Sequence, residues 1–575
     1  MEPRPLLSTP SAIPSTLKPP HSPGRFNGAL LGLAVLLTGC LSPEAAVLEA
    51  DEQIYALVME RREQILSEPA SFSIAPAEDS LRQQLLSGKG LDDPSIQELS
   101  LDDCLEIAAE NSRSYQSQKE QLYLAALDLT LERWRFGTLI DLGAGASASG
   151  DGFDDGSASA GADGSASRLF GNGGQVVTNI GASLFRAIGS GDGWDAIGNL
   201  GVSFTQPLLR GSAREVVMEP LTQAERNLVY AVRSFERFRR TFGQNVASRY
   251  YNLLLSRQTV ANEMKNKKAL ELLSRRNRAH AEAGQLNEIE ASQAAQSVLS
   301  SRNQLVTLEG RLNREMDSFK LFLGLPIDAE ISLAVKALEE LHVEDASSLL
   351  HGWTEIHLAQ LALSSRLDFL NSLEQLIDSE RQSRISADGL RAGLGLTSTL
   401  NASSTEGQPL SYSDDRLPWT VSLDLDLPVD QLPERNSYRR SLISLEARRR
   451  SMEELAESIR ADLRDSIRST QTTESTFRLQ KETIALNERR VLSANMMLQA
   501  GRTETRNLLD AQRDLLSARN AGDQALVDFT LAKLKLYLQL ELLEFDESGL
   551  VVHLDKLIQG PPLSTEAPQP AKGNE

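Results

Sequence analysis

The chain contains one long segment twice, and this repeat restricts the folds open to it more than any other feature. Residues 283–303 read AGQLNEIEASQAAQSVLSSRN, and residues 500–520 read AGRTETRNLLDAQRDLLSARN. In each copy an apolar-periodic run ends at an alanine–glycine pair, and another run begins just beyond it. Glycine ends helices readily because it adopts the left-handed backbone conformation without steric cost. The repeat therefore predicts two long helical hairpins, with turns at Gly284 and Gly501.

The long helix before each glycine carries a seam of apolar residues. In the first copy these residues step by three and four in turn, which is coiled-coil spacing: Leu221, Ala224, Leu228, Ala231, Phe235, Phe238 and Phe242. A helix over 215–283 would span about 100 Å at the usual rise per residue. The return helix over 286–323 is much shorter. We therefore expect a helix over 348–384 to continue it end to end, and a first helix over 100–136 to continue the last one over 502–545.

Alternating segments between the helical runs predict strands. The clearest are residues 200–207, LGVSFTQP, and residues 421–428, VSLDLDLP, with weaker signals in 142–148 and 390–400. Residues 149–198 are rich in Gly, Ala, Ser and Asp, so a flexible loop is expected there. The pattern leaves open whether this region adds a further strand. The expectation is thus four strands, in two pairs.

The N-terminus has the pattern of a secretory signal. Arg25 precedes a short apolar run, which is too short to span a bilayer. The sequence Leu37-Thr38-Gly39-Cys40 at its end resembles the bacterial lipobox. That resemblance implies a lipoprotein signal peptide over 1–39 and acylation of Cys40. Residues 40–98 would then be a lipid-anchored tether.

Charge and residue distribution disfavour nucleic-acid binding and catalysis. The net charge is −20, whereas phosphate binding needs a cationic face. The six histidines are scattered. His351 and His357 do not have the i,i+3 or i,i+4 spacing of a helical metal site. No enzyme activity, cofactor or metal is expected.

Two copies of strand, helix, glycine turn and helix behind a lipobox resemble the TolC-like outer membrane efflux family. The resemblance covers roughly residues 99–545 and rests on the Gln206-Pro207-Leu208 strand end, the two glycine turns and the Leu325-Pro326 break. It implies a mainly α fold with a small β part, in which each of three protomers adds four transmembrane strands to one β-barrel. Four strands alone leave open edges in a bilayer, whereas a closed barrel has none.

The resemblance also organises the chain into repeats. The first would cover 99–325 and the second 348–545, each with a helix, a strand pair and a helical hairpin. An equatorial segment would occupy 326–347. The tail over 546–575 is Pro-rich towards its end, which is expected to be disordered.

The implied function is that of a passive trimeric channel. It would lie in the outer membrane of a Gram-negative-type bacterium, with its helical body in the periplasm. An inner-membrane pump and a periplasmic adaptor would drive substrates through it, in a tripartite efflux or type I secretion system. The alternative is a non-porous periplasmic coiled-coil lipoprotein, either an adaptor or a scaffold.

The resemblance places a constriction after the second glycine turn, where family members often carry aspartates. Here Asp510 is the candidate carboxylate, Asn507 occupies the other expected position, and Glu290 is its counterpart in the first copy. Arg506 lies four residues before Asp510, the spacing of a helical ion pair, and Arg502 lies one turn further away. The alternative is that Asp510 is a solvated surface carboxylate.

Overall fold

The computed structural model describes most of the 575-residue chain and divides it into two compact units, residues 1–55 and 56–575. The described residues are 42–66, 72–75, 80–86, 98–151, 156–188, 194–334, 338, 341, 353–405, 408–412, 417–546 and 549–554. In the first unit these belong to the start of helix α2 (Pro43–Leu66). Cys40, the expected signal peptide and the residues after 554 lie outside the described ranges. The following paragraphs concern the second unit.

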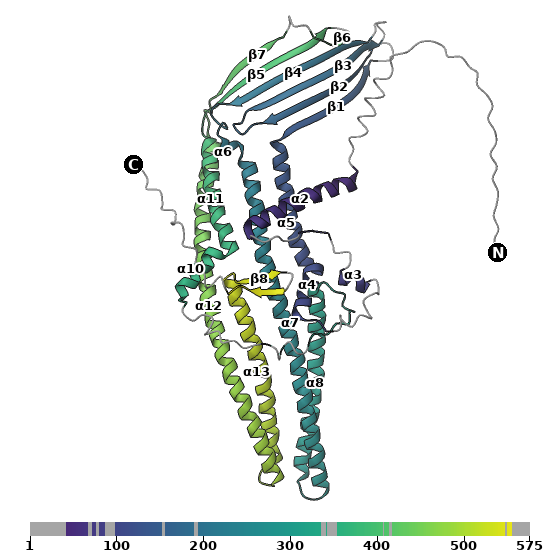
Figure 1. Ribbon diagram of the computed structural model, residues 1–575, viewed down its shortest axis with the longest axis vertical. Helices are drawn as coiled ribbons and strands as arrows, with labels where there is room; N and C mark the ends of the chain where they lie inside the picture. Colours follow the sequence, from purple (N-terminus) through teal and green to yellow (C-terminus); the bar gives the residue numbers. More distant parts are fainter. Residues whose placement is uncertain are drawn as a thin grey trace, which may run out of the picture. The chain divides into compact units, whose positions relative to one another are not determined.

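Two long helical hairpins dominate the second unit (Figure 1). The first consists of α7 (Glu219–Glu282) and α8 (Glu288–Leu323), and the second of α12 (Leu432–Gln499) and α13 (Thr505–Gln539). Gly284 and Gly501 lie in the two turns with φ of 74° and 66°. Both glycines therefore have the left-handed conformation that side chains other than glycine resist. Every helix in the described ranges is too short or too polar to cross a membrane.

Shorter helices extend the hairpins. They are α3 (Leu81–Leu86), α4 (Leu101–Asn111), α5 (Arg113–Arg135), α6 (Arg214–Val217), α10 (Glu355–Ser365) and α11 (Leu367–Asp388). Ser100 caps α4 in a capping box with Asp103, as its position in the sequence suggests. The expected continuous helices over 100–136 and 348–384 are each interrupted, at Ser112 and at Arg366. Both residues have extended backbone angles, which a helix cannot contain.

The expected end-to-end pairing of the helices is wrong. The end of α8 meets α4, so closely that a Cβ atom on Gly324 would lie 2.0 Å from the Asn111 carbonyl oxygen. The end of α13 packs instead with α10, where Leu361 and Leu536 belong to one buried cluster. Helix length alone could not distinguish the two pairings. Each short helix continues the return helix of its own repeat.

One antiparallel sheet lies at the end of the helical body opposite the glycine turns (Figure 1). Its strands are β1 (Thr138–Gly150), β2 (Gly156–Leu169), β3 (Gln175–Ile188), β4 (Asp195–Pro207), β5 (Gly393–Thr405), β6 (Gln408–Tyr412) and β7 (Trp419–Asp426). The order is β1-β2-β3-β4-β5, and β5 then pairs with β7 along its first part and with β6 at its end. Six strands therefore form the main run of the sheet, since β6 pairs with only the last two residues of β5.

The expectation of four strands is wrong, and so is the flexible loop over 149–198. Strands β2 and β3 are each 14 residues long and occupy most of that region. They form a hairpin between β1 and β4 and pair with both along nearly their full length. The small side chains of β2 carry little hydrophobicity, so its alternation is weak in the sequence.

A second, two-stranded sheet of β8 (Leu543–Asp546) and β9 (Gly549–Val552) follows α13, where the sequence suggested helix up to 545. Glu541 ends the helix with a φ of 59°, unusual for a residue other than glycine. Its buried carboxylate forms ion pairs with Arg237 and Arg240 of α7. These ion pairs anchor the strained residue against the long helix.

The helical core follows the apolar seam identified in the sequence. Leu228, Phe235 and Phe242 of α7 are buried, and Phe242 packs its ring 5.2 Å from that of Tyr115 on α5. In the second repeat, Ile459 and Leu463 of α12 are buried against α10 and the end of α13. Interlocking of apolar side chains therefore holds the long helices to the short ones.

Candidate functional site

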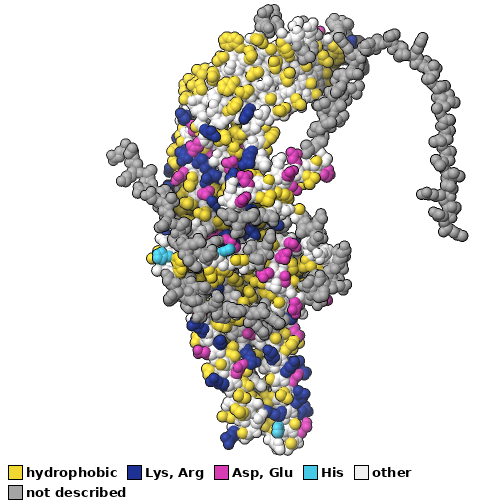
Figure 2. Space-filling view, in the orientation of Figure 1, with side chains coloured by type: hydrophobic (Ala, Val, Ile, Leu, Met, Phe, Trp, Pro, Cys, Tyr) yellow, Lys and Arg dark blue, Asp and Glu magenta, His cyan; other side chains and the backbone are white. Residues whose placement is uncertain are grey.

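The sheet has one apolar face that is exposed in the single chain. On β1, Ile140 and Leu142 are each 72% exposed. The strand register places the following residues on the same face: Ala144, Ala160, Ala162, Val176, Ile180, Leu184, Leu200, Val202, Leu396, Leu400, Trp419, Val421, Leu423 and Leu425. Hydrophobic side chains cover the sheet in Figure 2, whereas charged ones gather over the helices. So large an exposed apolar surface marks contact with a membrane or another protein.

The opposite face of the sheet is polar and consists mainly of small side chains. It carries Asp141, Ser147, Ser149, Ser157, Ser159, Asp163, Ser165, Asn179, Asn199, Ser203, Thr397, Thr399, Asn401, Ser422 and Asp424. The hydroxyl oxygens of Ser147 and Ser159 lie 2.8 Å apart across β1 and β2. Gly143 leaves space for the Asp163 carboxylate on the neighbouring strand. Alternation of apolar and polar residues is typical of strands between lipid and a watery interior.

Both edges of this sheet lack a partner strand within the described chain. Strand β1 pairs only with β2, and β7 pairs only with β5, in the strands that the structure describes. Exposed edges present unpaired backbone N–H and C=O groups, which natural proteins cover or pair. In hydrocarbon, each unpaired group would cost several kcal/mol. The sheet is therefore complete only when further strands join both edges.

The two glycine turns lie at the other end of the molecule, and a buried contact joins their hairpins. The Asn277 amide of α7 donates to the Thr505 hydroxyl at 2.9 Å. The backbone N–H of Thr505, at the start of α13, donates to a carboxylate oxygen of Glu290 on α8 at 3.1 Å. Thr505 is completely buried. We call this contact the tip clasp.

The tip clasp was not found in the sequence, although one signal for it was present. Glu290 occupies the position in the first copy that Asn507 has in the second. Glu290 caps the other hairpin, because a carboxylate at a helix start stabilises free N–H groups and the positive end of the dipole. Asn507 instead donates to Thr503 in its own turn at 2.8 Å. The two equivalent positions therefore have different roles, since Glu290 joins the two hairpins and Asn507 stabilises its own turn.

The predicted constriction residues lie together on the first two turns of α13 and in the loop before it. Asp510 forms long ion pairs with Arg506 at 3.9 Å and with Arg513 at 3.7 Å. The side chains of Arg506 and Asp510 are 76% and 43% exposed. Arg502 lies in the exposed turn after Gly501. Exposed pairs of this kind contribute at most about 1 kcal/mol, so Asp510 and its arginines are loosely held.

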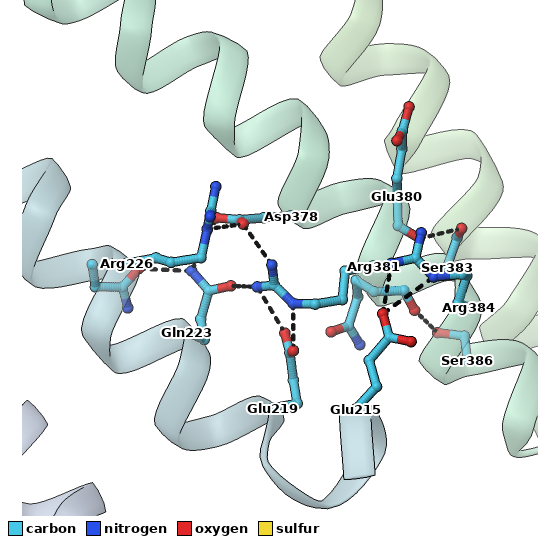
Figure 3. Close-up of polar contacts among 12 residues, drawn as sticks. Glu215, Glu219, Gln223, Arg226, Asp378, Glu380, Arg381, Ser383, Arg384 and Ser386 are labelled. Carbon is cyan, nitrogen blue, oxygen red and sulfur yellow. Dashed lines mark hydrogen bonds and ion pairs between the residues drawn. The ribbon is translucent and has the colours of Figure 1, made fainter. Parts of the chain in front are cut away.

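A network of ion pairs joins α7 to α11 (Figure 3). The Arg381 guanidinium donates to Glu219 at 2.5 Å, to Asp378 at 2.9 Å and to Gln223 at 2.9 Å. Burial alone would lower the pKa of Arg381, but its hydrogen bonds to the Glu219 and Asp378 carboxylates outweigh burial and raise the pKa. Arg226 pairs with the same Asp378. This network holds α7, which follows β4 in the chain, against α11, which precedes β5.

The described residues contain no cluster of His, Cys, Asp or Glu that could hold a metal ion. Cys104 is completely buried in α4, and burial raises the pKa of its thiol far above the ordinary value. A protonated, inaccessible thiol is unreactive. Cys104 is a core residue.

Comparison with known proteins identifies the fold. No family model and no curated protein matches the chain. Among solved structures, the CmeC outer membrane channel of Campylobacter jejuni matches 80% of this chain and 88% of its own, with a TM-score of 0.56 and 13% identity. The chain has the TolC-like outer membrane channel fold. The outer membrane protein VceC of Vibrio cholerae shares it, at a TM-score of 0.57 and 14% identity over 76% of this chain and 95% of VceC.

The MtrE outer membrane channel of Neisseria gonorrhoeae extends the comparison. Its TM-score is 0.54 at 14% identity, with 76% of this chain and 88% of MtrE covered. The TolC-like fold thus spans most of the chain, although the sequences share few residues. At such low identity the likeness establishes the arrangement of helices and strands, and the roles of individual residues rest on this structure alone.

Proposed function

We propose that this protein is a trimeric outer membrane channel through which an adaptor and pump pass substrates, in a tripartite efflux or type I secretion system. The observation that carries the proposal is the two-faced sheet with unpaired edges. Its apolar face suits lipid, its polar face suits a watery passage, and three copies would close the edges. Solved structures that share this fold include proteins described as outer membrane channels, which supports the proposal.

The helical body carries further surface suited to contact with copies of itself. Large apolar side chains on α8 and α12 are exposed in the single chain: Ile289, Leu299, Val306, Leu321, Ile443, Leu479, Leu486 and Leu492. Isolated exposed apolar residues are common, but rows along two long helices are typical of helix–helix interfaces. The trimer would bury these rows and surround a passage continuous with the polar face of the sheet.

The tip would close the passage at its periplasmic end. Three copies of Asp510 around a narrow opening would attract cations and repel anions. The Arg506 pairing holds the closed state in this proposal, and an adaptor opens the tip by displacing it. The exposure and length of that ion pair support easy exchange of partners. The constriction would comprise Arg502, Arg506, Asn507 and Asp510.

Assembly and conductance test the proposal. The full-length protein, extracted in mild detergent, should have the mass of a trimer by light scattering and should form channels in planar bilayers. A stable monomer that forms no channels would contradict it and favour the non-porous lipoprotein, adaptor or scaffold.

Two tip variants test the gate. Asp510→Ala should lower the preference for cations, because it removes the carboxylate ring. Arg506→Ala should raise the resting conductance, because it frees Asp510. The matched control is Arg513→Ala, which removes the partner on the side of Asp510 away from the tip. If both tip variants conduct like the parent, Asp510 is a surface carboxylate and the gate lies elsewhere.

A further inference from the structure

The hairpin of β2 and β3 has the same two faces as the strands on either side of it. Ala160 and Ala162 of β2 pair with Ala146 and Ala144 on the apolar face of β1. They pair on the other side with Leu184 and Ala182 of β3. Ser, Gly and Asp occupy the alternate positions of β2 from 157 to 167. A loop folded over the sheet would not need to preserve this alternation, whereas a strand between lipid and water requires it.

The turn between β2 and β3 has a defined structure and contacts the end of β4. The Phe170 N–H donates to the Gly174 carbonyl oxygen, and the Gly173 N–H donates to that of Phe170. The Gln206 side-chain amide donates to the backbone carbonyl oxygen of Asn172 at 2.8 Å. Gly173 has a φ of 79°, and a Cβ atom there would lie 2.7 Å from Pro207. Only glycine fits at this point. The hairpin is therefore anchored against the base of the sheet.

Two arginines bound the apolar face of this hairpin. Arg168 lies near the helical end of β2, opposite Val176, and Arg186 lies near the outer end of β3. Arginines at such positions extend to the polar boundaries of a membrane. The ten steps from Val176 to Arg186 span roughly 26 Å along the membrane normal, at about 3.4 Å per residue and a tilt of about 40°. The apolar band of outer membrane barrels is about 25 Å tall.

The directions of the edge strands also permit three copies of the sheet to join into one closed barrel. Every neighbouring pair in the sheet is antiparallel, so β1 and β7 at its two edges run in opposite directions. Joining β7 of one protomer to β1 of the next therefore continues the antiparallel pattern. An inserted pair of strands preserves this match, whereas a single strand would destroy it.

Resting on the trimer proposed above, we infer that the outer mouth is a barrel of eighteen strands, six from each protomer, with β2 and β3 in its wall. Barrel diameter grows roughly in proportion to strand number, so this mouth would be about 1.5 times as wide as a twelve-stranded one. Its added wall presents mainly small and polar side chains to the interior, with Val177 and Phe185 of β3 as larger apolar ones. The mouth would therefore admit wide, hydrated solutes.

Cysteine labelling tests whether the hairpin is in the wall. In a Cys104→Ala background, Ser159→Cys and Ala160→Cys place neighbouring thiols on the polar and apolar faces of β2. The matched pair on β1 is Ser147→Cys and Ala146→Cys. A water-soluble maleimide, applied to outer membranes, should label both serine-derived thiols and neither alanine-derived thiol. Cryo-electron microscopy of the trimer should show eighteen strands.

The outcomes separate this inference from the proposed function. One set of results would overturn the eighteen-stranded barrel alone. In it, both Ser159→Cys and Ala160→Cys are labelled, only the serine-derived thiol of the β1 pair is labelled, and the trimer shows twelve strands. Loss of contrast on β1 as well, or a monomer, would overturn the channel itself. The substituted strand side chains are small, exposed on β1 and half-buried on β2, so each variant should fold.

Discussion

Thr505 links the two hairpins through a few atoms, so its contribution can be isolated. Thr505→Val removes the hydroxyl that accepts from Asn277 and leaves a buried amide without its partner. An unsatisfied buried donor costs about 1–3 kcal/mol. We expect a lower unfolding temperature and a higher resting conductance, because the hairpin tips separate more easily.

The matched control for this prediction is Thr483→Val on α12. The Thr483 hydroxyl donates only to the Leu479 carbonyl within its own helix. Its loss should change neither the unfolding temperature nor the conductance appreciably. A Thr505→Val protein indistinguishable from this control would show that the tip clasp is dispensable.

Asp523 gives the stability of the helical body a pH dependence of defined sign. Burial raises the pKa of Asp523, although hydrogen bonds from Asn262 and Gln258 act in the opposite direction. The folded state therefore holds this proton up to higher pH than the unfolded state does. Stability from this group is present below the unfolded pKa, near 4, and is lost as pH rises through the folded value.

Asp523→Asn should accordingly raise the unfolding temperature at neutral pH and have less effect in mild acid. Asparagine retains an oxygen that can accept from Asn262. Asp528→Asn, on the exposed side of the same helix, is the control and should shift the unfolding temperature equally at both pH values. If Asp523→Asn also shifts the unfolding temperature equally at both pH values, the ionisation of Asp523 does not affect stability.

Individual residues were predictable from sequence where local chemistry determines them. The glycines at 284 and 501 and the Ser100 cap lie where helix-ending and helix-starting signals predict. The tip clasp was not predictable, because Asn277, Glu290 and Thr505 come together only through the packing of separate hairpins. The acylation of Cys40 and the gate at Asp510 stay predictions.

At the scale of elements, Arg381 of α11 donates to side chains of α7 in the network that docks the two helices (Figure 3). Arg381 and its partners Glu219 and Asp378 are each at most 13% exposed at the side chain. Arg381→Met removes the arginine partner of Glu219 and one of the two arginine partners of Asp378, which should cost roughly 3 kcal/mol. Arg384→Met, whose pair with Glu215 is largely exposed, should cost less than about 1 kcal/mol. Urea unfolding in detergent compares them, and equal losses would contradict the argument.

The elements themselves were unequally predictable. Long helices carry a strong periodic signal, so α7 and α8 were expected close to their observed bounds, whereas α13 ends six residues before the expected 545. Strands β2 and β3 were largely missed because the alternation of alanine with serine has low contrast in hydrophobicity. What identifies β2 is its register against β1, and register cannot be read from one strand alone.

At the scale of the whole molecule, the sheet and the predicted acyl group at Cys40 would be two separate means of holding the protein to a membrane. The predicted lipid would anchor the protein whether it is a channel or a non-porous lipoprotein, because both can carry a lipid. The apolar face of the sheet gives an anchor only to a protein whose strands lie in the bilayer. Removing the lipid therefore distinguishes the two functions.

The experiment exchanges residues 1–40 for a signal sequence that ordinary secretory signal peptidase removes, so that the mature chain starts at Leu41 without lipid. If three sheets form a barrel, this protein should stay in the outer membrane during alkaline carbonate washing, because a closed barrel is embedded in hydrocarbon. The parent protein is the positive control, and a soluble periplasmic protein in the same cells is the negative one. Complete release of the unlipidated protein would mean that the acyl chains alone hold it. The sheet would then meet another protein instead of lipid, and the non-porous lipoprotein would be the better description.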